Sequence, residues 1–328
     1  MNVARDFTAD PLSIQWSALT DAAGQPSNED ACIAIEAVGA TVLIVADGVG
    51  GQAQGEVASD TVVRAATEYL CRRADVHDSP AKLLTAAFEF AQDALRTVIV
   101  NSPMARSMRS TLLIAMATRS SLWVAHVGDS RAYLIRGGTV TQLTRDDTIV
   151  QTLMDLGQLD RGAARRHSKR NVLLQSLGDP KDLDIHVSES LAPEEGDVLV
   201  VCSDGPPDVL DDSEFAACAG TGTSAQMAAA LMAAALERHA PDNVSVGVLV
   251  WRKSQKRLSV AASGHGQPIA RPRDHFRAVA VVLLLVLAAL VAAGIVRRTT
   301  RRFGSAAAAA HAMVPATSQV TLACKTLP

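Results

Sequence analysis

The sequence is poor in features that mark several protein classes. Its 328 residues contain five cysteines, none in a CxxC pair, which is too few to staple a chain of this size, so reduced and buried thiols are expected. None of the eight histidines falls in an HxH or HxxxH spacing, which disfavours zinc. The 31 basic and 34 acidic side chains give a net charge of -3, so the chain offers no bulk attraction to nucleic acid.

The first sixteen residues also lack the apolar stretch of a signal peptide. They read MNVARDFTADPLSIQW, a polar and acidic segment, so we expect the N-terminal part to stay in the cytoplasm. A hydrophobic content of 48% with 20% charged residues excludes disorder, and the length predicts one large or two small domains.

One long apolar run lies near the C-terminus. Residues 278–296 read AVAVVLLLVLAALVAAGIV, without a charged or polar side chain, and predict a transmembrane helix; a buried core helix is the alternative. Arginines flank both sides, so charge does not orient it. The expected organisation is a globular domain at 1–252, a basic flexible linker at 253–277 near anionic lipid, the span, and a short low-complexity outer tail at 297–328. This predicts a single-pass protein of the cell membrane with a cytoplasmic domain.

Within residues 1–252, short β-branched runs alternate with alanine-rich stretches. Strands are predicted at 41–46, 120–127, 131–135, 197–202 and 243–251, and helices at 55–74, 81–100 and 223–239. Gly137-Gly138 indicates a hairpin. Paired strands without regular βαβ alternation predict an α+β fold with layers around sheets.

Acidic residues follow or precede several of these strands. Asp47-Gly48, Asp129-Ser130 and Asp204-Gly205 come directly after apolar runs, and Asp242-Asn243 precedes one. Each alone is typical of a turn. Four such cases, together with Asn28-Glu29-Asp30, indicate carboxylates that converge on one cleft.

Clustered carboxylates raise one another's pKa unless a cation neutralises them, so the pattern predicts a metal site. Oxygen ligands without His or Cys favour Mg²⁺ or Mn²⁺. Two such ions can activate a water between them and neutralise a phosphoryl group, so no protein nucleophile is needed. The sequence therefore predicts metal-assisted hydrolysis of a phosphoester.

These residues resemble the ordered motifs of PP2C-type (PPM) metal-dependent serine/threonine protein phosphatases, bacterial members included. The resemblance covers about residues 10 to 252; any single motif is weak, and their order is specific. The motifs are Asn28-Glu29-Asp30, Asp47-Gly48-Val49-Gly50-Gly51, Gly55-Glu56-Val57-Ala58-Ser59, Val127-Gly128-Asp129-Ser130-Arg131, Leu177-Gly178, Gly196-Asp197, Ser203-Asp204-Gly205 and Asp242-Asn243. The resemblance implies a four-layer αββα sandwich of two antiparallel sheets flanked by helices.

The resemblance also implies a ligand set for two Mn²⁺ or Mg²⁺ ions. Asp47 would bridge both, and the Gly48 carbonyl would bind the second. Asp204 and Asp242 would hold the first ion, and Glu29 would hold waters on the second.

Three further residues receive roles in the same way. Asp30 would support the cluster, and Asp129 with Asp204 would hold a third, weaker ion. Arg131 either braces Asp129 or reaches towards the substrate phosphate. The implied partners are phosphorylated proteins, including a Ser/Thr kinase that the enzyme opposes and its substrates.

The sequence departs from the family pattern at three places. Bacterial members usually carry an arginine that clamps the substrate phosphate five residues before Asp30, where this chain has Gln25, and a neutral amide lacks that charge. Val49 and Gln52 stand where members often have a histidine, which removes a general acid from that loop. Pro206-Pro207 replaces the usual Leu-Thr and predicts a stiffer loop.

The segment from Thr144 to Gly178 occupies the place of the family's mobile flap. Its basic run, residues 165–170, predicts either a solvated face or a contact with phosphopeptide.

Two other functions compete with phosphatase activity. Residues 48–53 formally fit the dinucleotide-binding pattern G-x-G-x-x-G/A, but Asp47 directly before them would face a pyrophosphate. A catalytically weak or silent binding module would explain Gln25 and Val49, but the carboxylates oppose it. We therefore predict hydrolysis of phosphoserine and phosphothreonine on proteins.

Overall fold

The computed structural model describes residues 12–50, 53–72, 78–253 and 321–323, and all structural statements concern these residues. The predicted linker and membrane span, most of the tail, and Gln52 lie outside them. Within the described part of the chain, no helix combines the length and apolar composition needed to cross a membrane.

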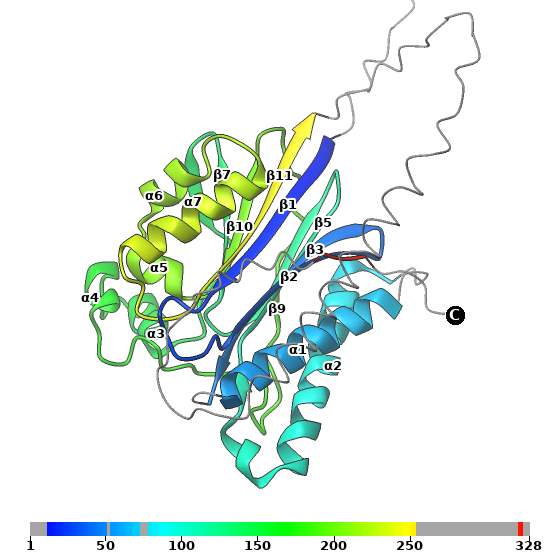
Figure 1. The fold of residues 1–328 in the computed structure, drawn as a ribbon, viewed down its shortest axis with the longest axis vertical. Helices are drawn as coiled ribbons and strands as arrows, with labels where there is room; N and C mark the ends of the chain where they lie inside the picture. The colour runs from blue at the N-terminus through cyan, green and yellow to red at the C-terminus, as the bar shows by residue number, and fades with distance from the viewer. Residues whose placement is uncertain (1–11, 51–52, 73–77, 254–320, 324–328) are drawn as a thin grey trace, which may run out of the picture. The chain divides into compact units, whose positions relative to one another are not determined.

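Two β-sheets form the centre of the fold (Figure 1). The first has the order β1-β11-β10-β7-β8, and all its neighbours are antiparallel. Its strands are β1 (Leu12–Asp21), β11 (Val244–Lys253), β10 (Val198–Cys202), β7 (Arg131–Arg136) and β8 (Thr139–Gln142). Gly137 and Gly138 join β7 to β8 with φ of 56° and 82°, which confirms the predicted hairpin.

The second sheet has the order β12-β2-β3-β5-β6-β9. Its strands are β12 (Thr321–Ala323), β2 (Asp30–Ala37), β3 (Ala40–Val49), β5 (Leu112–Ala117), β6 (Leu122–Val127) and β9 (His186–Val187), and β4 (Arg109–Ser110) pairs with the end of β3. All pairs are antiparallel except β12 with β2. The strand β12 belongs to the predicted outer tail. A tail that pairs with β2 cannot at the same time lie on the opposite side of a membrane from the domain.

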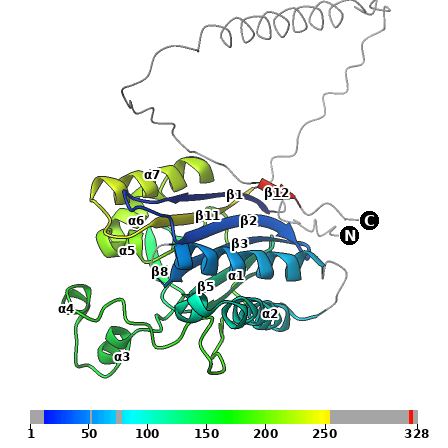
Figure 2. The same cartoon turned by 60° about the horizontal axis from the view of Figure 1, so that its bottom comes forward.

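Helices cover the outer faces of both sheets (Figures 1 and 2). The second sheet is covered by α1 (Ala53–Arg72) and α2 (Pro80–Asn101), and the first by α6 (Asp212–Cys218) and α7 (Ser224–Glu237), preceded by α5 (Gly205–Val209). A short 3₁₀ helix, η1 (Pro103–Ser107), follows α2. Figure 2 shows α3 (Ile149–Asp155) and α4 (Arg161–Arg165) standing apart from the sandwich, in residues 144–178, here called the flap segment.

Three separate apolar layers hold these elements together. On β3, Val42 and Ile44 pack towards α1 and α2, whereas Leu43 and Val45 pack into the space between the sheets. On β10, Val200 packs towards α7. Central strands such as β3 and β10 bury both faces, with side chains that alternate with a period of two. The four-layer sandwich is therefore confirmed, as are the five predicted strands and three predicted helices.

The cysteines do not all follow the expectation of reduced thiols. Cys202 is a buried free thiol, and Cys32 and Cys218 are half-buried free thiols. Cys71 is disulfide-bonded, so the expectation is wrong at that position.

Candidate metal centre

The predicted carboxylates lie together at one end of the sandwich. They line a cavity of about 390 Å³, here called the carboxylate cavity. Its described lining includes Glu29, Asp47, Gly48, Asp129, Asp204 and Asp242. These residues come from the start of β2, the end of β3, the turn between β6 and β7, the end of β10 and the start of β11. Antiparallel pairing brings the end of one strand beside the start of the next, which explains the convergence.

The β2–β3 pair fixes the centre of this site. Asp30 and Asp47 stand opposite each other in the antiparallel register. The backbone N–H of Asp47 donates to Thr111 Oγ1 over 2.8 Å, and the N–H of Thr111 donates to the Asp47 carbonyl over 2.8 Å. Thr111 therefore locks the backbone of Asp47 from the other side, a role that the sequence did not reveal.

Gly48 is required by close backbone packing. Its N–H donates to the Glu29 carbonyl over 3.0 Å, and a Cβ at position 48 would collide with the Gly55 carbonyl oxygen. A residue with a side chain would thus push β3 away from the start of α1. The Gly-rich motif lets the Gly48 backbone remain part of the cavity wall.

Asp204 is placed at the join between β10 and α5. A Cβ at Gly205 would collide with the Asn243 carbonyl, so glycine allows α5 to begin against β11. Pro206 and Pro207 are buried in the first turn of α5, where proline's missing N–H costs no helical hydrogen bond. The Oδ1 atom of Asp204 is buried without a hydrogen-bond partner within the described structure.

Asn243 connects the first and last parts of the domain. Its Oδ1 accepts a 2.7 Å hydrogen bond from the Glu29 N–H, and its Nδ2 donates to the carbonyls of Ala22 and Ser27. The side chain thereby holds the loop that carries Glu29 beside Asp242. The Asp-Asn motif drew attention to position 243, but this bracing role was not predicted.

Asp30 has its own support beneath the cavity. Ser203 Oγ donates to Asp30 Oδ2 over 2.6 Å and accepts from the Ser245 N–H over 3.1 Å. Ser203 was visible only as a member of the Ser-Asp-Gly motif. The predicted supporting role of Asp30 now has a geometric basis, because its carboxylate ties β2 to β10.

The cavity is electrostatically unfavourable for carboxylates alone. Burial, assisted by neighbouring carboxylates, raises the pKa of Asp30 and of Asp129 to about 7. Burial followed by the charges of Asp30, Asp204, Asp129 and Asp242 raises the pKa of Asp47 well above its usual value, and the pKa of Asp204 rises for the same kind of reason. These carboxylates are kept ionised at neutral pH only if cations join them.

The donor set fits divalent cations. Asp204 Oδ1 is an acceptor in need of a partner, and the surrounding donors are carboxylate and carbonyl oxygens, which suit Mg²⁺ and Mn²⁺. Within the described residues, no three His, Cys, Asp or Glu side chains form a ready-made ion cluster. An ion here would draw on these carboxylates together with the Gly48 carbonyl and water.

Gln25 and Val49 also line the carboxylate cavity. Gln25 Nε2 donates to the Pro241 carbonyl over 2.8 Å, and Val49 is 45% exposed. Two of the residues that depart from the family pattern, Gln25 and Val49, are thus part of the same cavity.

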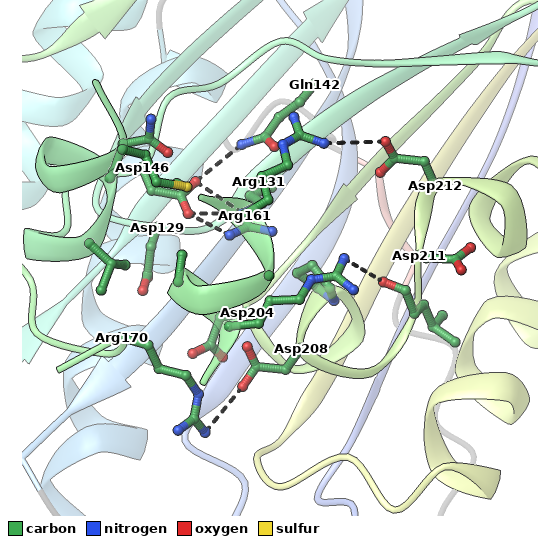
Figure 3. Close-up of a pocket in the computed structure, with 18 of the residues that line it drawn as sticks. Asp129, Arg131, Gln142, Asp146, Arg161, Arg170, Asp204, Asp208, Asp211 and Asp212 are labelled. Atoms are coloured by element: carbon green, nitrogen blue, oxygen red, sulfur yellow. Dashed lines mark hydrogen bonds and ion pairs between the residues drawn. The ribbon is translucent and has the colours of Figure 1, made fainter. Parts of the chain in front are cut away.

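Arg131 faces elsewhere. Its guanidinium donates to both oxygens of Asp146 over 2.6–3.0 Å and to the Tyr133 hydroxyl over 3.2 Å (Figure 3). It lines a second cavity beside the first. Burial raises the pKa of Asp129 whereas the charge of Arg131 lowers it, and the two predicted roles, bracing Asp129 or reaching phosphate, stay predictions.

The family model for protein phosphatase 2C matches residues 21–240. The chain belongs to this protein phosphatase 2C family. It is 34% identical over 252 residues to the serine/threonine protein phosphatase PstP of Mycobacterium tuberculosis, covering 75% of this chain and 47% of that protein. It is also 33% identical over 186 residues to the serine/threonine phosphatase stp of Listeria welshimeri, covering 53% of this chain and 69% of the relative.

Solved structures of the protein phosphatase 2C family agree with the fold. The catalytic domain of PstP, crystallised in complex with two manganese ions, matches with a TM-score of 0.65 at 32% identity, covering 74% of this chain and 99% of that chain. The Streptococcus agalactiae serine/threonine phosphatase matches with a TM-score of 0.66 at 27% identity, covering 73% and 99%. The chain spans about half the length of the M. tuberculosis phosphatase, so the similarity concerns the protein phosphatase 2C domain.

Proposed function

We propose that this protein hydrolyses phosphoserine and phosphothreonine on proteins, and that it opposes a Ser/Thr kinase. The single observation that carries the proposal is the gathering of Asp47, Asp204 and Asp242 around one cavity, with Asp204 Oδ1 buried and unpartnered in the described structure. Membership of the protein phosphatase 2C family and the manganese complex of PstP support it.

The proposed cofactors are two Mn²⁺ or Mg²⁺ ions, with a third at Asp129 and Asp204. Asp47 would be a ligand of both ions, Asp204 and Asp242 would hold the first, and the Gly48 carbonyl would bind the second, whose waters Glu29 would hold. When bound, the ions supply Lewis-acid activation of water and neutralise phosphoryl charge.

The protein's own residues keep this arrangement in place. Ser203 holds Asp30 in position, and Thr111 holds Asp47. Asn243 fixes the loop that carries Glu29 by accepting a hydrogen bond from the Glu29 N–H. Preorganised carboxylates of this kind need little rearrangement when substrate arrives.

Turnover of p-nitrophenyl phosphate and of a phosphothreonine peptide with Mn²⁺ tests the proposal. We expect metal-dependent hydrolysis that Asp47→Asn lowers by at least about a hundredfold. Exposed Asp60→Asn, on the outer surface of α1, is the matched control and should keep full activity. Absence of metal-dependent turnover in the unmutated protein would instead favour a silent binding module.

We also propose that residues 278–296 attach the protein to the cell membrane with its phosphatase domain in the cytoplasm. The support is the uninterrupted 19-residue apolar run. Protease treatment of intact spheroplasts tests it: a tail after residue 296 that is cut from outside agrees with one crossing, whereas a tail protected with the domain agrees with the β12–β2 pairing.

A further inference from the structure

Positive charge is lacking in the described wall of the carboxylate cavity. Its described lining contains no Lys, Arg or His, and Gln25 stands where an arginine is expected, with its amide engaged by the Pro241 carbonyl. A phosphoester dianion entering this cavity meets several carboxylates, so positive charge beyond bound ions would assist its capture. A cationic side chain from a neighbouring part of the fold could supply this charge.

A second cavity, of about 730 Å³, adjoins the first. The two share Asp129, Asn171 and Asp204 in their walls. This flap cavity lies between the flap segment and the α5–α6 region, as Figure 3 shows. Four arginines line it: Arg131, Arg161, Arg165 and Arg170.

Three of these arginines donate their hydrogen bonds to groups outside the shared wall, although the charge of Arg131 also counters the rise that burial causes in the pKa of Asp129. Arg131 is held by Asp146 through three hydrogen bonds of 2.6–3.0 Å. Arg161 is directed to Asp212 over 3.4 Å, and Arg165 Nη2 donates to the Leu210 carbonyl over 3.4 Å. Both of these acceptors follow α5 in the chain, at the far side of that helix from Asp204.

Arg170 differs from these arginines in its position. The next residue, Asn171, lines both cavities. The Arg170 Nη2 atom lies 3.5 Å from Asp208 Oδ2, and the two side chains are 37% and 22% exposed. A long and partly exposed ion pair of this kind contributes little stability. Its guanidinium is therefore available to a stronger anion.

Asp208 links this pair to the carboxylate cavity. It lies one helical turn after Asp204 on α5, and its charge is among the causes that raise the pKa of Asp204. Figure 3 shows Arg170 and Asp208 beside Asp204, whereas Arg161 points to Asp212. A phosphate bound at the carboxylate cavity would thus compete with Asp208 for the same guanidinium.

We propose, resting on the proposed phosphatase function, that Arg170 provides the substrate-phosphate contact that Gln25 cannot provide. Arg170 exchanges the Asp208 carboxylate for a phosphate oxygen of the bound phosphoprotein. A guanidinium suits this exchange because it stays charged and can donate two parallel hydrogen bonds. Asp208 positions the guanidinium when no substrate is bound and competes with the phosphate for it. The two residues therefore have contrary effects on substrate affinity.

The test compares Arg170→Ala with Asp208→Asn in Mn²⁺-dependent hydrolysis of a phosphothreonine peptide. We expect Arg170→Ala to raise KM about tenfold, the effect of one lost charged hydrogen bond, with kcat within about twofold. Asp208→Asn should lower KM, and Arg170→Lys should lie between Arg170→Ala and the unmutated protein. Arg166→Ala removes an exposed charge from the same basic run, lines neither cavity, and should change nothing.

A second-site rescue sharpens the test. Gln25→Arg in the Arg170→Ala background should return KM towards the unmutated value, and inhibition by inorganic phosphate should shift in parallel with KM. If Arg170→Ala and Asp208→Asn both raise KM, the pair merely anchors the flap segment and the proposal is wrong. An unchanged KM in Arg170→Ala would overturn it while leaving phosphatase activity in place, whereas no turnover in the unmutated protein would overturn both.

Discussion

Asp30 and Asp47 lie directly opposite each other on adjacent antiparallel strands, and Asp47 lines the carboxylate cavity. Like charges at facing positions of a sheet are destabilising, and here burial adds to the cost. A fold that retains this pair needs protons or cations to relieve it. The relationship therefore connects the stability of the domain to pH and to divalent ions.

The first prediction concerns pH and metal. The pKa of Asp30 and of Asp129 rises from 3.8 to about 7, so each binds its proton more tightly in the folded state than in the unfolded state. Their contribution to stability is complete below about pH 4 and is lost as pH rises through about 7. We expect the Mn²⁺-induced gain in the free energy of unfolding to be larger at pH 7.5 than at pH 5.

Urea unfolding of the full chain with EDTA and with Mn²⁺ at the two pH values measures this gain. Asp30→Asn should reduce the fall in metal-free stability between pH 5 and 7.5. Equal stabilisation by Mn²⁺ at both pH values would argue against a site of repelling carboxylates.

The second prediction concerns Ser203. Ser203→Ala removes the 2.6 Å hydrogen bond to Asp30 and leaves Oδ2 of a buried carboxyl without this donor. We expect the free energy of unfolding to fall by about 1–3 kcal/mol, the cost of an unsatisfied buried polar group. Urea titration measures it, with Ser120→Ala, at an exposed position, as the control. A change below about 0.5 kcal/mol would show that Ser203 does not support Asp30.

The third prediction concerns Gly48. Because a Cβ there would collide with the Gly55 carbonyl, Gly48→Ala should destabilise the domain by more than about 3 kcal/mol and weaken Mn²⁺ binding. Gly138→Ala, with φ of 82° and open space around it, isolates the effect of backbone strain and should cost only about 1 kcal/mol. Similar thermal shifts for the two variants would contradict the proposed close approach of β3 to α1.

Part of the fold followed from the sequence because some strands are locally unmistakable. β10 and β11 are apolar on both faces, so their composition alone distinguishes them from helices and loops. β5 was missed because its residues, LLIAMA, are mostly strong helix formers, and only pairing with β3 and β6 decides the strand. β1 and β2 were missed because their polar residues interrupt the apolar pattern.

The site, like the fold, could be predicted only in part from the sequence. The carboxylates were predictable because they stand at strand ends in a recognisable order. Their supports were not, because the contacts span large sequence separations: Asn243 binds the Glu29 N–H across 214 residues, and Ser203 binds Asp30 across 173. The role of Arg131 at Asp129 or at the substrate phosphate stays a prediction, and its contact with Asp146, 15 residues away beyond the β7–β8 hairpin, was not foreseen.

The most direct test of the account is a count of bound Mn²⁺ ions on the full chain by calorimetric titration, with Asp47→Asn and Asp242→Asn as comparisons. We expect at least two ions for the unmutated protein, and loss of one or both in each variant because a ligand is removed from the shared cavity. The claim that these carboxylates form a metal centre would be contradicted if all three proteins bound Mn²⁺ equally. It would also be contradicted if the unmutated protein bound no more Mn²⁺ than an unfolded control.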